Sequence, residues 1–412
     1  MRKLVIALSL LSACATSSQS GGARPRQNKI DPTPAIQLLQ ATRFDEAEAK
    51  AREILAGEPP NAQANVVAAI ALYKRTLHQV VQDAVSIAMG AAQSHRVNYQ
   101  YLNYALSNAD AGLTMVERYL AVAGTDSNFT LDLCLACWRY DWNHNGRIDW
   151  RDEELFQIEV DAQGERIPKE DPRRKPTFRF DLGDVHWARA MVMFQHAALN
   201  IAMAYDFSDL DKLILTDHHR DARPQAFTLR LKDKGRLKRA KTLILDGLAA
   251  AELARKLYQA ETDDVNEWVP NPRQNQHPLP LPVDEALYET WGGILADVVR
   301  LVQGQEGLSV AELAQLGDHR WQFPPRGYLN LGRLLDEPAD VVFHTSTFEE
   351  LARMRADNPA LVERLLQEVF GDKYGMSMKP SPLLRRLQRM KQEIDRGQES
   401  LNRKLRYLFW LN

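Results

Sequence analysis

Residues 141–152 form the one stretch of the sequence whose side chains and spacing indicate a specific chemistry. Counted from Asp141, oxygen-bearing side chains stand at positions 1, 3, 5, 9 and 12, with glycine at position 6 and isoleucine at position 8. Oxygen atoms of this kind are the ligands that hard divalent cations prefer. Gly146 permits the positive φ of a sharp turn, which brings the two halves of the stretch together. The spacing therefore predicts a cation-binding loop, which we name the 141–152 loop.

The pattern resembles the EF-hand family, in which a twelve-residue loop wraps one Ca²⁺ ion. The resemblance implies ligands from six residues: side-chain oxygens of Asp141, Asn143 and Asn145, the backbone carbonyl of Arg147, Asp149 directly or through water, and Asp152. Asp152 departs from the family because glutamate is usual there, and the shorter side chain weakens the expected site. EF-hands normally occur in pairs, and the sequence has no second loop of this quality. We therefore expect a static structural clamp more than a sensor, with flanking helices over residues 131–140 and 153–160.

The N-terminus has the pattern of an exported protein. Two basic residues precede an apolar run over residues 4–11, as in a signal peptide. The run ends in Leu-Ser-Ala-Cys at residues 11–14, which resembles the lipobox of bacterial lipoproteins. The resemblance implies that residues 1–13 are removed and that acyl chains on Cys14 anchor the protein, with alanine after the cysteine favouring the outer membrane, facing the periplasm. An ordinary secretory signal with an incidental cysteine is the alternative.

Cys134 and Cys137 form a C-x-x-C pair shortly before the loop. This spacing suits a structural disulfide, free thiols, a redox motif or half of a zinc site. Zinc requires two further ligands, and no second pair follows at a suitable distance. A thioredoxin-like βαβ context is also missing. In an oxidising compartment we favour a structural disulfide that staples the helix entering the loop.

The composition is that of a globular protein. The chain has 412 residues, of which 45% are hydrophobic and 26% charged, and its net charge of −2 gives no reason to expect nucleic-acid binding. Beyond the signal peptide, no apolar run approaches the length of about 18 residues that a membrane-spanning helix needs. We expect a folded body held at the membrane by its lipid anchor.

Apolar residues at helical spacing predict an all-α fold in which helical hairpins pack as an extended array. Residues 44–59 resemble the second helix of a tetratricopeptide repeat, and residues 61–75 the first helix of a following repeat. No third copy is evident, so a simple αα-hairpin is an equal alternative. Residues 76–122 are also expected to be helical, with core positions at Met89, Leu102, Leu106, Leu113, Val116 and Tyr119. Further helices are predicted over 183–205, 242–258, 283–303 and 381–408, and short strands over 177–182 and 339–344.

The predicted organisation has five parts. Residues 15–32 are a polar, flexible tether, and residues 33–269 form a helical domain that contains the 141–152 loop. The proline-rich residues 270–282 are a linker, and residues 283–412 form a C-terminal helical region. His186 and His196 are expected to be core or boundary histidines, and the basic residues 230–241 a solvated helical face.

No enzyme signature motif occurs in the sequence. The leading hypothesis is a scaffold or protein-interaction role in the cell envelope, with a protein partner there and with Ca²⁺ stiffening the helical body. The alternative is an enzyme or solute-binding component whose site is dispersed in the sequence. A deep cleft with convergent polar side chains would favour the alternative.

Overall fold

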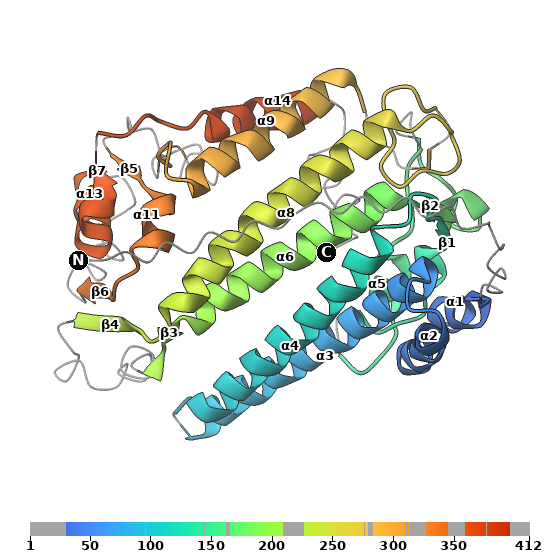
Figure 1. Cartoon of the computed structure of the whole chain (residues 1–412), viewed down its shortest axis with the longest axis horizontal. Helices are drawn as coiled ribbons and strands as arrows, with labels where there is room; N and C mark the ends of the chain where they lie inside the picture. The colour runs from blue at the N-terminus through green and yellow to red at the C-terminus, as the bar shows by residue number, and fades with distance from the viewer. Residues whose placement is uncertain are drawn as a thin grey trace, which may run out of the picture.

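The computed structural model describes residues 30–94, 96–142, 145–161, 165–208, 226–275, 277–278, 283–309, 312, 327–344, 359–375 and 377–395. The signal peptide, the lipobox with Cys14, most of the tether, Asn143, residues 279–282 and residues 396–412 lie outside the described residues. Most of the described chain is helical, which confirms a mainly α-helical fold (Figure 1). Three small sheets accompany the helices, so the strict all-α class is too narrow.

The N-terminal helices form two successive hairpins. They are α1 (Thr33–Gln40), α2 (Phe44–Gly57), α3 (Ala62–Ser94) and α4 (Tyr99–Ala123). Buried alanines, among them Ala51 and Ala68, let these helices approach closely. The α3 helix runs to Ser94 instead of ending near residue 75, so it is much longer than the repeat helix that residues 61–75 resemble.

The α3–α4 hairpin corrects one expectation about the core. Val116 is buried on α4 as expected, but Met89 on α3 is 58% exposed. The helical spacing of Met89 is real, yet this end of the hairpin extends past its packing partners toward the edge of the molecule (Figure 1). A periodic apolar position is buried only where a second element covers it.

The central helices lie side by side. The α6 helix (Leu182–Met203) contacts α4 on one side and α8 (Lys234–Ala260) on the other. The next neighbours are α9 (Glu285–Val302) against α8, and α14 (Leu383–Asp395) against α9 (Figure 1). Several of the buried residues between α6 and α8 are alanines, such as Ala190 and Ala251, and they let the two backbones approach closely beside larger residues such as Leu248. The central helix α6 thus has a helical neighbour on each side.

Short strands connect these helices. An antiparallel pair is formed by β1 (Leu131–Leu133) and β2 (Phe178–Phe180), and a three-stranded sheet by β3 (Tyr205–Asp206), β4 (Ala226–Leu231) and β6 (Val341–His344). The predicted strands over 177–182 and 339–344 contain β2 and β6. Pairing of β4 with β6 joins the regions on either side of residues 270–282, so the two predicted regions share a sheet.

The remaining elements are short. They are α5 (Trp150–Glu154), α11 (Leu331–Asp336), α13 (Pro359–Phe370), β5 (Tyr328–Leu329), β7 (Tyr374–Gly375) and the 3-10 helices η1 (Leu135–Cys137), η2 (Pro172–Arg174) and η6 (Gly371–Lys373). Within the part of the chain that the structure describes, no helix is both long and apolar enough to cross a membrane.

The close packing of α6 and α8 can be tested by overfilling it. Ala251→Leu adds volume at a fully buried position, and we expect the free energy of unfolding to fall by about 1–3 kcal/mol. Leu253→Ala on the exposed side of the same helix is the control and should change it by about 0.5 kcal/mol or less. Urea denaturation measures both. If the two substitutions change the free energy of unfolding equally, the α6–α8 interface is not closely packed around Ala251.

Candidate functional site

The 141–152 loop is not flanked by two helices. Residues 131–140, predicted as the entering helix, form β1, the 3-10 helix η1 and an extended segment. Leu131 and Leu133 are buried and Asp132 is exposed, which is the two-residue period of a half-buried strand. After the loop, α5 provides only a short helix. The pairing of β1 with β2 therefore replaces the helix that an EF-hand would have before the loop.

Within the loop, two aspartates hold the backbone. Asp141 Oδ1 accepts a hydrogen bond from the Asn145 amide at 3.1 Å, and Asp141 Oδ2 accepts one from the Gly146 amide at 2.7 Å. Asp152 accepts from the amides of Trp142 at 2.9 Å and Asp149 at 3.0 Å, and only 3% of Asp152 is exposed. The first and twelfth positions thus fix both ends of the loop.

The turn at Gly146 follows the expected geometry. Its φ is +83°, in the left-handed region that favours glycine. Asn145 stabilises the same turn because its Oδ1 accepts a hydrogen bond from the Arg147 amide at 2.8 Å. The expected ligand Asn143 lies outside the described residues.

The donors of the loop suit a hard cation, because all of them are oxygens. A carboxylate oxygen has two lone pairs, so one backbone hydrogen bond does not by itself prevent it from binding an ion. The carboxylate oxygens of the three loop aspartates do not all lie within 4.8 Å of one another. Among the described residues, only the carboxylates of Asp181, Glu261 and Glu267 form such a group. The loop thus has oxygen donors of the kind a hard cation prefers, while in the structure Asp141 and Asp152 accept hydrogen bonds from loop amides.

Trp142, the second residue of the loop, attaches it to the helical body. Its ring stacks on Trp138 with centroids 6.1 Å apart and meets the edge of Phe156 at 4.7 Å. The ammonium of Lys74 on α3 lies 4.3 Å from the centroid of the Trp142 ring, a cation–π distance. Sequence reasoning missed this contact because α3 is far from the loop in the sequence.

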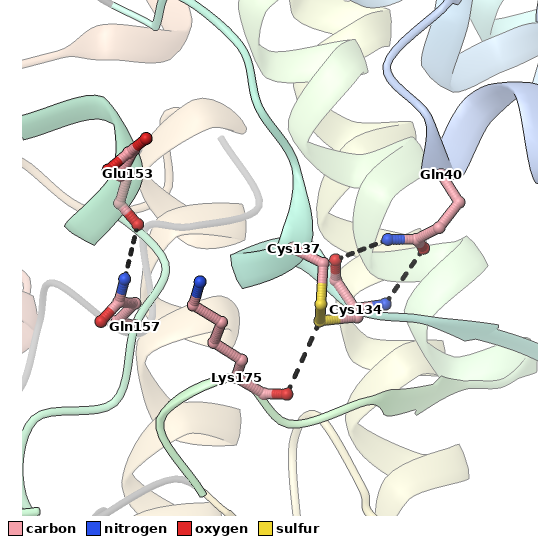
Figure 2. Close-up of a disulfide and its surroundings, with 6 residues drawn as sticks. All are labelled: Gln40, Cys134, Cys137, Glu153, Gln157 and Lys175. Carbon is pink, nitrogen blue, oxygen red and sulfur yellow. Dashed lines mark hydrogen bonds between the residues drawn. A yellow bond between two sulfur atoms is a disulfide. The ribbon is translucent and has the colours of Figure 1, made fainter. Parts of the chain in front are cut away.

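A disulfide joins Cys134 and Cys137 across η1, just before the loop (Figure 2). The side chain of Gln40, at the end of α1, donates to the Cys134 carbonyl at 2.8 Å and accepts from the Cys134 amide at 3.2 Å. The disulfide therefore closes a 3-10 turn that is tied to α1, and not a helix as the sequence suggested.

A second group of oxygen ligands lies at the N-terminus of α6. Carboxylate oxygens of Asp181, Glu261 and Glu267 lie within 4.8 Å of one another, and Glu267 is 2% exposed. Asp181 is the N-cap of α6 and forms a capping box with Asp184. Burial, and then the charge of Asp181, raise the pKa of Glu261 to about 9 and that of Glu267 to about 7. The raised pKa values favour the protonated carboxyl groups, and a cation bound between the carboxylates would offset their mutual repulsion in the same way.

This cluster could not be predicted from the sequence, because Asp181 lies far along the chain from Glu261 and Glu267. The Asp181–Asp184 spacing was the only local signal, and it indicates a helix start, not a cation site.

The basic run over residues 230–241 is not only a solvated face. Arg236 Nη1 lies 3.1 Å from Asn200 Oδ1 and 3.4 Å from Asp110 Oδ2, so it faces the interior between α4, α6 and α8. His196 is fully buried, and its Nε2 is 2.7 Å from Asp110 Oδ1. These residues form a polar contact inside the helical array, which a charge run in the sequence does not distinguish from a surface.

The raised pKa of Glu261 predicts a dependence of stability on pH. The protonated carboxyl suits its buried site, so its contribution is complete below the unfolded-state pKa near 4.5 and is lost as the pH rises through about 9. Glu261→Gln keeps the neutral form, so we expect the variant to lose less stability than wild type between pH 5 and pH 9. Thermal unfolding across this range measures the difference.

The control for that series is Glu53→Gln, because the Glu53 side chain is 69% exposed. It should follow the wild-type pH profile. If Glu261→Gln also follows it, burial does not hold a proton on Glu261.

No family model matches the chain, and comparison with curated proteins and with solved structures finds no significant similarity.

Proposed function

We propose that this protein is a lipid-anchored helical component of the bacterial cell envelope, with a scaffold or protein-interaction role and a structural Ca²⁺ ion in the 141–152 loop. The anchor is Cys14, at the outer membrane facing the periplasm. The ion is held by oxygens of Asp141, Asn143, Asn145, Arg147, Asp149 and Asp152. The observation that carries this proposal is the attachment of the loop to the helical body through Trp142.

A structural role is favoured over a sensor role by what flanks the loop. Sensor EF-hands respond by changing the angle between two helices. Here the segment before the loop is a strand and a disulfide-closed turn, so a helix pair that could open is lacking among the described residues on either side of the loop. An ion bound by both Asp141 and Asp152 would instead hold the two ends of the loop together and so keep Trp142 packed against the helical body.

The interaction role is supported by the free end of the α3–α4 hairpin. Val85 and Met89 on α3 and Tyr104 on α4 are 49%, 58% and 61% exposed. Val85 and Met89 are four residues apart, so they share one face of α3, and exposed apolar patches are typical of protein-contact surfaces. The partner we propose is another protein of the cell envelope, with no role for nucleic acid.

Solute binding is the second candidate, and a partly open, mostly apolar cavity in the helical body favours it. The two roles are compatible, because Val85, Met89 and Tyr104 are not part of the cavity lining.

Calcium should stabilise the fold through the loop. We expect saturating Ca²⁺ to raise the thermal midpoint of the wild-type chain by several degrees relative to chelator, since an ion that binds only the folded state stabilises it. Asp141→Ala removes a ligand and should abolish this shift. Differential scanning calorimetry with and without chelator measures the shift within each variant.

The matched control is Asp45→Ala, whose side chain is 85% exposed on α2. It should keep the full calcium shift. A shift that persists in Asp141→Ala would place the responding ion elsewhere, and no shift in wild type would remove the structural role of calcium.

The hairpin surface can be tested in cells. A photo-crosslinking amino acid at Met89 should give a discrete adduct with an envelope protein, whereas the same group at Leu253, which is 42% exposed on α8, should not. Immunoblotting after irradiation reads out both. Absence of an adduct at Met89, or an identical pattern at both positions, would contradict the assignment of this surface.

A further inference from the structure

A partly open cavity of about 130 Å³ lies in the helical body, and Trp142 of the 141–152 loop is part of its lining. Its walls come from α3, α4 and α6 on one side and from the β1–β2 pair with the aromatic residues around Trp142 on the other. Most of the lining is aliphatic or aromatic, as with Ile70, Leu120 and Met191. The size is close to that of an engineered apolar cavity of about 150 Å³ that binds benzene. The cavity therefore has room for one six-membered ring or a similar aliphatic group.

Four polar side chains also line the cavity, and three of them are engaged. Tyr73 and Gln195 are hydrogen-bonded to each other at 2.8–3.0 Å. Asp184 accepts from the Tyr258 hydroxyl at 2.8 Å, and burial raises its pKa, which favours the uncharged acid. Lys74 is the fourth: its ammonium lies 4.3 Å from the centroid of the Trp142 ring and 6.0 Å from that of the Tyr73 ring, and it has no ion pair or hydrogen bond within the described part of the chain.

Lys74 is thus a cation without a counter-ion at an apolar cavity. Desolvation lowers the pKa of Lys74 to about 8, so most of it still carries a charge at neutral pH. A positive charge in such a position is stabilised most by an anion that comes with its own apolar body. A dianion would bring a second charge that Lys74 alone does not balance.

Two further donors belong to the aromatic wall around Trp142, over whose ring the Lys74 ammonium lies. The indole N–H groups of Trp138 and Trp142 are buried and have no hydrogen-bond partner among the described residues. Trp138 as a whole is only 5% exposed. An indole nitrogen can only donate, so an acceptor must be supplied to satisfy it. Buried donors without acceptors are costly and rare in folded proteins. A carboxylate placed near Lys74 offers the acceptor atoms that this wall lacks.

We infer that the cavity is a binding site for a small monocarboxylate with an apolar body of about six carbons, whose carboxylate pairs with the Lys74 ammonium and whose body fills the space between α3 and α6. This site goes beyond the structural calcium and the hairpin surface proposed above, and it requires neither of them.

The inference is tested with three ligands of nearly equal shape: cyclohexanecarboxylate, cyclohexylmethanol and cyclohexylmethylammonium. Isothermal titration calorimetry of the full chain should show one equivalent of the carboxylate bound, with the alcohol about ten-fold to a hundred-fold weaker and the ammonium weaker still. Lys74→Met keeps the length of the side chain without its charge. It should therefore weaken binding of the carboxylate by the same factor of about ten-fold to a hundred-fold and leave the affinity for the alcohol unchanged. Lys256→Met, at a side chain 64% exposed on α8, should change nothing.

Each outcome decides the inference. Failure of wild type to bind the carboxylate, equal affinity for carboxylate and alcohol, or unchanged carboxylate affinity in Lys74→Met would overturn it. If circular dichroism shows that Lys74→Met is unfolded, the order of the three ligands on wild type decides alone. Ala69→Leu, which fills the cavity from α3, should then abolish binding of both the carboxylate and the alcohol.

Discussion

The packing of Trp142 against α3 is the contact on which the rest of the account depends. The backbone amide of Trp142 is held by Asp152, while its ring lies against Trp138, Phe156 and the Lys74 ammonium. Aromatic pairs and cation–π contacts of this kind each contribute about 0.5–2 kcal/mol. One side chain thus belongs both to the 141–152 loop and to the cavity wall. An interaction that orders the 141–152 loop therefore also holds the Trp142 side chain in place in the cavity wall.

The helical body provides a rigid surface for this contact because its helices approach closely. Alanines at the α6–α8 interface leave little space between the two backbones, and the polar contact of Asp110 with His196 and Arg236 fixes how α4, α6 and α8 meet. The N-terminus of α6 is held by its capping box, and the buried carboxylates around Asp181 sit where the positive end of the helix dipole favours acidic groups. The same helix that lines the cavity therefore begins at the acidic cluster.

Periodicity and local spacing were sufficient for much of this structure. The predicted helices over 183–205 and 283–303 correspond closely to α6 and α9, because apolar residues recur at helical spacing in both. Gly146 adopts the positive φ that its place in the loop requires. These are properties of one segment and its own side chains, which a sequence displays directly.

What the sequence did not reveal depends on contacts between distant segments. Residues 131–140 were predicted as a helix, but Leu131 and Leu133 pair with β2 and take the strand period. Met89 has the spacing of a core residue and is exposed because no element covers it. The inward turn of Arg236, the grouping of Asp181 with Glu261 and Glu267, and the position of Lys74 over Trp142 each join elements from different parts of the chain. Composition and periodicity contain no information on such pairings.

The most direct test of the central claim is backbone hydrogen exchange, residue by residue, with and without Ca²⁺. If the ion clamps the loop to the body, the amides of Trp142, Gly146 and Asp149 will exchange more slowly with calcium, and the part of α3 around Lys74 will gain protection, while α9 stays unchanged. Exchange that is the same in both conditions throughout the loop, or protection of the loop without any change around Lys74, would contradict the account.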